Sequence, residues 1–584
     1  MSLMSVLSVG NRALQASQLG IDVTGQNISN AGVEGYSRKR INQTSMYAYD
    51  STYGQMGLGA RVVNVERLRN TFLDQQIRKQ NSEIGYFSAV SSAFDRMESI
   101  LHEPGDLGVM YYMDEFFNSW QNLSNNPEDV AARTLVRTNA QIMIDTFRKT
   151  AIELANLREQ QNEQMPMHVN RINQITAQIM NLNQEVAAVE IGNQHANDSR
   201  DCREVLLKEL SQYIDINVIE NDMGMVTVTT AGHVLIAPSY KQNIEVNTIK
   251  RELEDGTVVH DIGLRFSDSR IDFVPTGGQL RGMFDNRDIY IPEYQKKLDE
   301  FAAAIVKAVN DIHVEGYNLQ GVSGFHFFDP IDLNNPGKVT ASTIALSAAV
   351  KGNVHNIAAA TALQAVTDGR NTIPVPDPAA LPPVTGYAYG DAPIQLMQVP
   401  LNPDQRAYNV ITDSVVITVN TKNGIAIPGS IPLVLEEGKD YVIDYTLGTF
   451  QMLHDGYDNE EFDIKFNYFR GGFEGPGGNK NALAIAELRN AMTMTPDGLG
   501  NPTATFTEYF SSVVGRLGLN SSQAMSNLET RVFLAAQYET QQDAIAGVSL
   551  DEEMANLIKF QHTYTAAARL ITTVDRMLDT LLNM

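Results

Sequence analysis

Cysteine is almost absent from this chain: Cys202 is the one cysteine among 584 residues, so no internal disulfide can form. Long hydrophobic runs are also missing, because no stretch approaches the roughly 18 consecutive apolar residues of a membrane span. The opening segment, residues 1–6, has neither a charged start nor an apolar block, so we expect no cleaved signal peptide. These absences fit a cytosolic protein, and they fit equally well a chain that is exported unfolded without cleavage.

Positive charge is scarce, since 44 Lys and Arg stand against 69 Asp and Glu and the formal net charge is −25. A nucleic-acid partner is not expected, because phosphate binding needs clustered cations. A membrane partner is not expected either, because the sequence has no basic amphipathic face. The length predicts roughly three to five domains.

Catalytic signatures are missing as well. The sequence contains no His-Glu-x-x-His, no Gly-x-Ser-x-Gly, no Walker loop and no Gly-x-Gly-x-x-Gly after a strand. The glycine-rich segment 475–480 resembles a phosphate loop, but its spacing is wrong and no Ser or Thr follows Lys480, which favours a simple turn. We therefore expect no enzymatic activity and no cofactor.

One group of polar residues has a composition that would suit a cation. Asp198, Asp201 and Glu204 alternate with Arg200 and Arg203. Ion pairs along a helix face, together with a helix N-terminal cap, explain this pattern better than a metal site.

Isolated metal-ligand residue types do not alter this expectation. His313 and His562 fall in predicted helices without a second His or Cys at ligand spacing, so they are expected to be hydrogen-bonded or surface histidines. Cys202 has no nearby histidine in the sequence and is expected to be inert. No metal is predicted.

The C-terminal segment has the clearest helical pattern. It carries two apolar series with a spacing of seven, offset by three: Leu557, Tyr564, Ile571 and Leu578, then Phe560, Ala567, Val574 and Leu581. Acidic residues 551–553 precede them, where a helix dipole favours negative charge. The spacing predicts a coiled-coil-like helix.

The N-terminal segment, residues 3–30, shows a related pattern. A bulky series with a spacing of seven is followed three residues later by a small series: Leu7, Leu14, Ile21 and Ile28, then Gly10, Ser17 and Thr24. Small residues allow a partner backbone to approach closely, and each interior glycine costs ~1 kcal/mol of helix propensity. We predict that this helix needs a partner, and that the bulky N-terminal series and the two C-terminal series form an assembly interface.

An apolar helical stripe usually lies in an ordinary core. Both stripes here are thin and occupy the extreme ends, which are normally the least ordered parts of a chain. Burial of the large C-terminal residues would gain on the order of 10–15 kcal/mol, against ~1–2 kcal/mol of backbone entropy for each ordered residue. We therefore expect the ends to be partly disordered in the free subunit and to fold on assembly.

The rest of the chain predicts a multidomain α+β protein, with helical terminal and inner domains and inserted β-rich outer domains. Helices are expected at about 70–102, 112–122, 127–191, 199–213, 290–314 and 480–495, with Pro104, Pro127 and Pro166 marking breaks or kinks. Alternating residues from 216 onward predict strands, and the Pro- and Gly-rich stretch 365–475 is interpreted as an inserted all-β surface module.

This pattern predicts a nested domain organisation. The expected domains are a terminal helical domain (1–65 and 545–584), a helical inner domain (66–215, 281–345 and 478–544), a β-rich module (216–280) and a variable β-rich surface module (365–475).

Several motifs resemble a known family. The segment 27–38, NISNAGVEGYSR, is similar to the N-terminal signature of bacterial flagellar rod, hook and hook-associated proteins, and 550–582 resembles their closing helix. Internal blocks at 57–62, 116–129, 197–203, 277–288, 310–318 and 479–484 follow the order found in the hook-associated protein 1 family, FlgK, although Cys202 and Glu204 depart from its usual residues. The stretch 365–475 is not covered by the resemblance.

The resemblance implies a structural adaptor that joins the flagellar hook to the filament and is located at that junction, outside the cell or in the periplasm if the flagella are internal. It also implies export through the flagellar type III channel, a chaperone at the C-terminal region, a ring of identical subunits, and the hook protein and the second junction protein as partners. The alternatives are a sibling hook or rod subunit, or a flagellar scaffold that carries a binding or enzymatic surface module.

Overall fold

The computed structural model describes residues 3–582, apart from a set of short segments. These are 48, 52–53, 104, 106–107, 193, 253–257, 330–338, 362–365, 374–393, 396, 399–401, 407–414, 420, 423–424, 427–432, 438, 445–448, 454–461, 470–475 and 496–501. Pro104 and part of the 365–475 stretch therefore lie outside the described residues.

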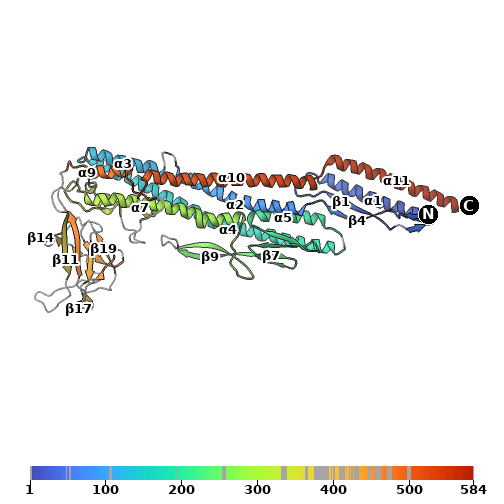
Figure 1. Cartoon of the computed structure of the whole chain (residues 1–584), viewed down its shortest axis with the longest axis horizontal. Helices are drawn as coiled ribbons and strands as arrows, with labels where there is room; N and C mark the ends of the chain where they lie inside the picture. The colour runs from blue at the N-terminus through green and yellow to red at the C-terminus, as the bar shows by residue number, and fades with distance from the viewer. Residues whose placement is uncertain are drawn as a thin grey trace.

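The molecule is an elongated rod with both chain ends at one tip and a β-module at the other (Figure 1). Its helices are α1 (Leu3–Ser29), α2 (Thr71–Leu101), α3 (Val109–Asn125), α4 (Val130–Glu190), α5 (Asn197–Tyr213), α6 (Gly278–Asp285), η1 (Asn286–Tyr290), α7 (Ile291–Glu315), α8 (Ala348–Gly352), η2 (Val354–Asn356), α9 (Lys480–Glu487), η4 (Leu488–Asn490), α10 (Phe506–Ala546) and α11 (Leu550–Leu582). This arrangement of helices and small sheets confirms the predicted α+β class.

The strands fall into small antiparallel sheets. They are β1 (Lys39–Ser45), β2 (Tyr49–Ser51), β3 (Gly54–Met56), β4 (Ala60–Arg67), β5 (Asn217–Glu220), β6 (Val226–Thr230), β7 (His233–Ala237), β8 (Tyr240–Lys241), β9 (Ile244–Glu252), β10 (Val258–Phe266), β11 (Val366–Ile373), β12 (Ile394–Gln395), β13 (Met397–Gln398), β14 (Asn402–Arg406), β15 (Val416–Val419), β16 (Thr421–Lys422), β17 (Ile425–Ala426), β18 (Leu433–Val434), β19 (Tyr441–Asp444), β20 (Thr449–Met452) and β21 (Phe462–Phe469). The two largest sheets have the orders β5-β6-β7-β8 and β11-β21-β15-β18.

The helical body is built from α2, α3, α4, α7, α9 and α10 around one aromatic core. Its rings include Phe116, Phe117, Trp120, Phe147, Phe301, Phe327, Phe328 and Phe506. Local signals set the helix ends: Asn70 accepts a hydrogen bond from the Phe72 N–H at the start of α2, and Thr505 with Glu508 forms a capping box at the start of α10.

A second core joins the middle strands to helices. Ile172, Ile175 and Ile179 of α4 and Leu207 of α5 are buried with apolar residues of β6, β7 and β10. A third core lies within the β11–β21 module and includes Ile417, Phe450, Phe462 and Ile464. The strands at 217–266 therefore pack on the helices that flank them in sequence, whereas the β11–β21 module has a core of its own.

Two local expectations can be compared with the structure. The sequence predicts a break or kink at Pro166, and α4 runs through this proline without a break. The carbonyl left without a partner belongs to Asn162, whose side chain links α4 to β10 by accepting from the Ile262 N–H at 2.7 Å. Met165 and Val169 are buried beside the proline, and their packing offsets the lost helical hydrogen bond.

The helix predicted at 480–495 ends early. After α9 and η4 the chain becomes extended, and the backbone of Met494 pairs with that of Ala504 in an antiparallel bridge. The pairing of Met494 with Ala504 takes the place of the last predicted helical turn.

Candidate functional site

The two chain ends form an antiparallel helix pair at the tapered tip of the rod (Figure 1). Side chains of α11 lie close to the α1 backbone at Gly10 and Gly20. A Cβ on Gly20 would lie 2.7 Å from Cδ1 of Phe560, and one on Gly10 would lie 3.0 Å from Cγ1 of Ile571. Bulky residues of α11 therefore fill the spaces that small residues of α1 leave, as knobs fill holes in a coiled coil.

The predicted interface residues differ in how deeply they are buried. Ala567 and Val574 are buried; Leu7, Leu14, Ile21, Ile28, Leu557, Phe560, Ile571 and Leu578 are half-buried; and Tyr564 is exposed. Leu581 lies in α11, but its side chain is outside the described part of the molecule. The buried face of α1 consists mainly of small residues: Gly10, Ala16, Ser17, Gly20, Val23 and Thr24.

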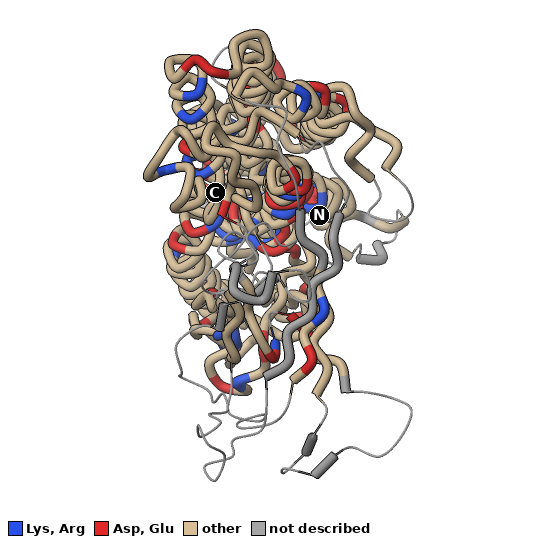
Figure 2. The backbone as a smooth tube through the Cα atoms, turned by 90° about the vertical axis from the view of Figure 1, so that its left-hand side faces the viewer, with Lys and Arg blue, Asp and Glu red and all other residues tan. Residues whose placement is uncertain are grey.

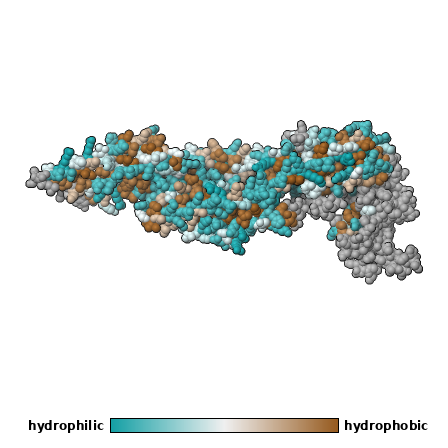
Figure 3. All heavy atoms as spheres, turned by 180° about the vertical axis from the view of Figure 1, so that it is seen from behind, coloured by the Kyte–Doolittle hydropathy of each residue, from teal (hydrophilic) through white to brown (hydrophobic). Residues whose placement is uncertain are grey.

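Several large apolar side chains of the tip face solvent. On α11 these are Leu550, Met554, Ile558, Leu570 and Met577, and on α1 Met4 is exposed. Figure 3 shows hydrophobic patches interspersed with polar surface along the tapered end. Figure 2 shows Lys and Arg interspersed with Asp and Glu along the described backbone.

A cavity of about 800 Å³ lies beside the helix pair. It is enclosed by α1, by the start of α11 and by the hairpin of β1 and β4, with Ala13, Gly20, Ile41 and Phe560 among its lining residues. The small-residue face of α1 is thus shared between α11 and this hairpin.

A buried polar junction connects the two helices at their inner ends. The amide nitrogen of Asn27 donates to Glu553 Oε2 and to the Lys39 carbonyl, both at 2.9 Å. Its amide oxygen accepts from the Lys39 N–H at 3.0 Å and from the Tyr36 hydroxyl at 2.8 Å. Arg38 donates to Glu553 Oε1 through Nε at 2.9 Å and through Nη2 at 2.7 Å. Asn27 and Glu553 are both almost fully buried.

Two residues of the loop that carries this junction, Tyr36 and Gly35, are constrained by their buried surroundings. Burial, reinforced by the nearby carboxylates of Asp198, Asp201 and Glu553, raises the pKa of Tyr36 to about 12, so its hydroxyl keeps its proton and remains a donor to Asn27. Gly35 has a φ of +80°, which a side chain would strain, and a Cβ there would also meet Val205.

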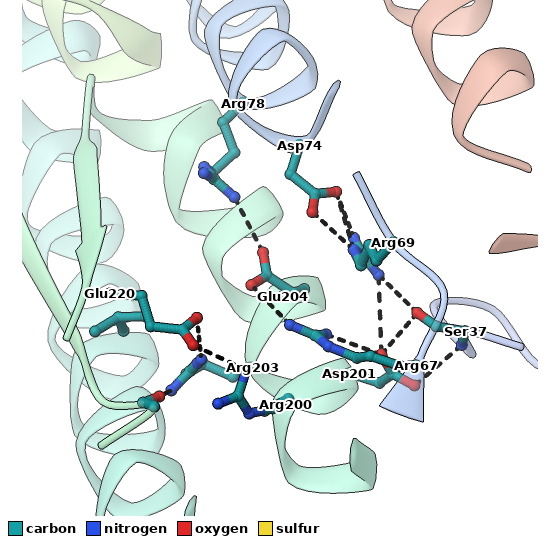
Figure 4. A network of polar contacts seen from close by, with 12 residues as sticks. Ser37, Arg67, Arg69, Asp74, Arg78, Arg200, Asp201, Arg203, Glu204 and Glu220 are labelled. Atoms are coloured by element: carbon teal, nitrogen blue, oxygen red, sulfur yellow. Dashed lines mark hydrogen bonds and ion pairs between the residues drawn. The ribbon is translucent and has the colours of Figure 1, made fainter. Parts of the chain in front are cut away.

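A second polar network ties the tip to the helical body (Figure 4). Asp201 of α5 accepts from the Ser37 N–H at 3.0 Å, from the Ser37 hydroxyl at 2.7 Å and from Arg67 Nη1 at 3.0 Å. Arg69 pairs with Asp74 of α2 at 2.9 Å and donates to the Ser37 hydroxyl at 3.2 Å.

The neighbouring Glu204 extends this network. It pairs with Arg78 at 3.0 Å and with Arg67 at 3.7 Å. Although burial acts in the opposite direction, the surrounding arginines hold the pKa of Glu204 below its ordinary value.

The cluster at 198–204 therefore forms ion pairs, as the sequence predicts, but not along its own helix. Asp201 and Glu204 meet arginines of other segments and Asp198 pairs with Lys39. Arg200 pairs with Glu190 and Glu220. The predicted N-terminal cap is wrong, because Ala196 at the cap position of α5 makes no side-chain hydrogen bond. Among the described residues, no group of three or more His, Cys, Asp or Glu is arranged to hold a metal ion.

The remaining candidate residues have structural surroundings. His313 is fully buried, and both of its ring nitrogens are hydrogen-bonded. Nδ1 donates to the Phe325 carbonyl at 2.5 Å, and Nε2 accepts from the Ala358 N–H at 2.9 Å. Cys202 is exposed. In the described part of the chain, every helix is too short or too polar to cross a membrane.

Sequence reasoning placed Asn27 and Arg38 in a family signature and gave Glu553 a helix-dipole role, but it did not predict a contact among them. A signal was present, because Glu553 lies seven residues before Phe560 and so continues the series Phe560, Ala567 and Val574 backward. A charged residue at a seam position of a heptad pattern indicates a buried polar contact.

Comparisons with known proteins agree with this architecture. Residues 94–328 match the model of the flagellar hook-associated protein FlgK helical domain, and residues 537–584 match that of the flagellar basal body rod FlgEFG protein C-terminal. Flagellar hook-associated protein 1 of Bacillus subtilis is 26% identical over 99% of this chain and 97% of the relative. Its counterpart in Salmonella typhimurium is 24% identical over 99% of this chain and 100% of the relative.

A solved structure shares the fold. The flagellar hook junction protein FlgK from Burkholderia pseudomallei aligns with a TM-score of 0.52 and 17% identity, covering 80% of this chain and 100% of the other. Over nearly its whole length the chain is therefore similar to flagellar hook-associated protein 1, and residues 94–328 match the FlgK helical domain.

Proposed function

We propose that this chain is a non-catalytic structural adaptor that joins the flagellar hook to the filament, and that the α1–α11 pair is the part that enters the tubular assembly. The observation that carries this proposal is the outer face of α11, where Met554, Ile558 and Met577 are exposed although the opposite face already packs on α1. Exposed apolar side chains that recur along a terminal helix are suited to packing against neighbouring subunits.

The division of the chain follows from the same arrangement. We propose that 1–65 with 545–584 is the assembly unit, that 66–215, 281–345 and 478–544 form the supporting body, and that 216–280 and 365–475 are outward modules. The partners in this proposal are identical subunits in a ring, the hook protein and the second junction protein. Export through the flagellar type III channel, with a chaperone at the C-terminal region, would deliver the chain to the junction outside the cell, or in the periplasm of a bacterium with internal flagella.

Deletion of the gene tests the joining role directly. Electron microscopy of the deleted and complemented cells should show hooks without filaments in the deletion, with flagellin lost to the medium. Cells without hooks would assign the protein to the hook or rod instead. Intact flagella would refute the structural role.

A charge on the outer face tests the interface itself. The side chain of Ile558 is 54% exposed, so its replacement by Asp does not disturb the contact between α11 and α1. We expect Ile558→Asp to yield a folded, exported subunit that fails to support filaments, because a carboxylate buried between subunits without a partner is costly. Thr530→Asp, at an exposed polar position of α10, is the matched control and should support normal filaments.

Ile571→Asp probes the other side of the same helix. Its side chain faces Gly10 within one subunit, so this change should separate the helix pair while the body remains folded. Incorporation should be lost here too. Normal filaments from both the Ile558 and the Ile571 variants would overturn the assignment of α11.

A further inference from the structure

The heptad pattern of the terminal helices does not by itself define one alignment. Phe560, Ala567 and Val574 repeat every seven residues in α11, and small residues repeat with the same spacing in α1. Sliding one helix by seven residues, about 10.5 Å at 1.5 Å per residue, would again place apolar residues opposite small ones. Another contact must select the observed register.

The observed register is nevertheless specific. From Gly10 to Gly20 to Asn27 along α1, the partners on α11 run backward from Ile571 to Phe560 to Glu553. The first two contacts are steric and the third is polar. The polar contact lies at the inner end of the pair, where α1 ends and α11 begins.

We propose that Asn27 and Glu553 are positioning residues that set the register of the terminal helix pair and thereby determine which side chains of α11 face the next subunit. All four hydrogen-bonding positions of the Asn27 amide are used, by Glu553, by Tyr36 and by the backbone of Lys39. Arg38 neutralises Glu553 from the same loop. The pair is therefore fully satisfied in this one alignment.

Other alignments would leave buried polar groups without partners. A slide of one heptad in one direction would put Phe560 opposite Asn27, and a slide in the other would put Glu553 near Gly20, on the small-residue face of α1. In both cases Asn27 and Glu553 separate, and burying either without its partner is unfavourable. One polar residue at a heptad seam position is known to fix helix register in this way.

The consequence for assembly rests on the proposed function, because the register decides where Ile558 and Met577 lie relative to the rest of the tip. The register itself is a property of the single chain. It can therefore be tested on the purified full-length protein, separately from filament attachment.

Disulfide trapping reads the register directly. In a Cys202→Ser background, Gly10→Cys is combined with Ile571→Cys to report the observed register, because a Cβ on Gly10 lies next to the Ile571 side chain. Gly10→Cys with Tyr564→Cys, or with Leu578→Cys, reports a slide of one heptad in either direction. The fraction of closed disulfide is measured by mass spectrometry after mild oxidation.

With Asn27 and Glu553 intact, we expect the Gly10–Ile571 pair to close and both displaced pairs to stay reduced. With Glu553→Leu or Asn27→Leu, closure of a displaced pair should rise by about tenfold or more. Glu553→Gln keeps an oxygen acceptor for the Asn27 amide and should retain the observed register. The double change Asn27→Leu with Glu553→Leu leaves neither of these two side chains buried without the other, so it serves if a single variant loses helix by circular dichroism.

Two outcomes would overturn the proposal. One is closure of the Gly10–Ile571 pair alone in the leucine variants, including the double variant. The other is equal closure of all three pairs in the chain that retains Asn27 and Glu553. A change in register with normal filaments would refute only the proposed consequence for assembly, and normal filaments from the Ile558 variant would refute the joining role without bearing on the register.

Discussion

At the residue scale, buried polar side chains hold distant segments of the body together. Arg133 donates through Nε at 3.0 Å to the carbonyl of Pro127 and also contacts that of Ile357, and burial lowers its pKa to about 10. Arg287 donates to the carbonyl of Ile262 at 2.6 Å and thereby links η1 to β10. Hydrogen bonds from a charged donor are stronger than those between neutral groups, so they tie these segments together firmly.

His313 makes the stability of the body sensitive to acid. Burial is the main cause that lowers its pKa to about 3, and the ring accepts from the Ala358 N–H only while neutral. Between about pH 6.5 and 3 the unfolded chain therefore binds the extra proton, and the free energy of unfolding decreases as pH falls, by about 1.4 kcal/mol per unit.

We expect the unfolding free energy of the body to fall by about 2 kcal/mol between pH 7 and pH 5 because of this one group, and His313→Gln to remove that loss. Denaturant unfolding at the two pH values measures the difference. His562→Gln, at an exposed position of α11, should leave the pH dependence unchanged. Identical slopes for the native chain and the His313 variant would contradict this account.

At the scale of elements, the terminal helices depend on close packing rather than on intrinsic helix propensity. α1 contains Gly10, Gly20 and Gly25, each of which weakens an isolated helix. Two of the three lie against α11, whereas a Cβ on Gly25 would contact nothing within 4 Å. The glycines therefore separate the effect of packing from the effect of propensity.

Gly20→Ala and Gly25→Ala should act in opposite directions. Both raise helix propensity by about 1 kcal/mol, but the new methyl at position 20 meets the ring of Phe560, and overpacking costs about 1–3 kcal/mol. Hydrogen exchange of the α1 and α11 amides should therefore speed up in the Gly20 variant and slow down in the Gly25 variant. Slower exchange in both would show that the helices are not closely packed in solution.

At the scale of the whole molecule, the rod consists of units with separate cores connected by polar contacts. The tip meets the body mainly through the Asp201 and Glu204 networks, and α10 is separated from α11 only by residues 547–549. The arrangement indicates that the tip is oriented by ion pairs, which are directional, and not by a shared apolar core.

Removing Asp201 should uncouple the tip from the body. Asp201→Ala leaves Arg67 and the Ser37 N–H without their buried acceptor, and breaking a buried pair costs about 3–5 kcal/mol. Limited proteolysis should then cleave near residues 30–40 and 547–549 while the body stays intact. Asp222→Ala removes a carboxylate at an exposed position between β5 and β6 and should have little effect; equal protection in both variants would contradict the role of Asp201.

The partial disorder of the ends in the free subunit remains a prediction at this scale. It follows from the thin seam of α1 and α11, whose bulky residues are only half-buried within one chain. Amide exchange in the isolated subunit should be faster in α11 than in α3 and α4, because the helix pair opens more often while it keeps its register when closed. Full protection of α11 would show that the helix pair is stable without neighbours.

The sequence by itself determined the elements whose pattern is local. Heptad spacing predicted α11, the Asn70 and Thr505 caps mark the starts of α2 and α10, and alternation predicted strands such as β6, because helix and strand periods depend on near neighbours in the chain. The ordered motifs also identified the family, and α1 was expected to need a partner.

Only the tertiary structure decided which residues meet. Asn27 and Arg38 lie 526 and 515 residues from Glu553 in the sequence, and Ser37 lies 164 residues from Asp201, yet each set forms a buried junction. At Pro166, α4 likewise makes a contact with a distant segment, from Asn162 to Ile262. A sequence pattern records periodicity and composition, but the partner of a buried polar group is set by how the whole chain packs, which no local window contains.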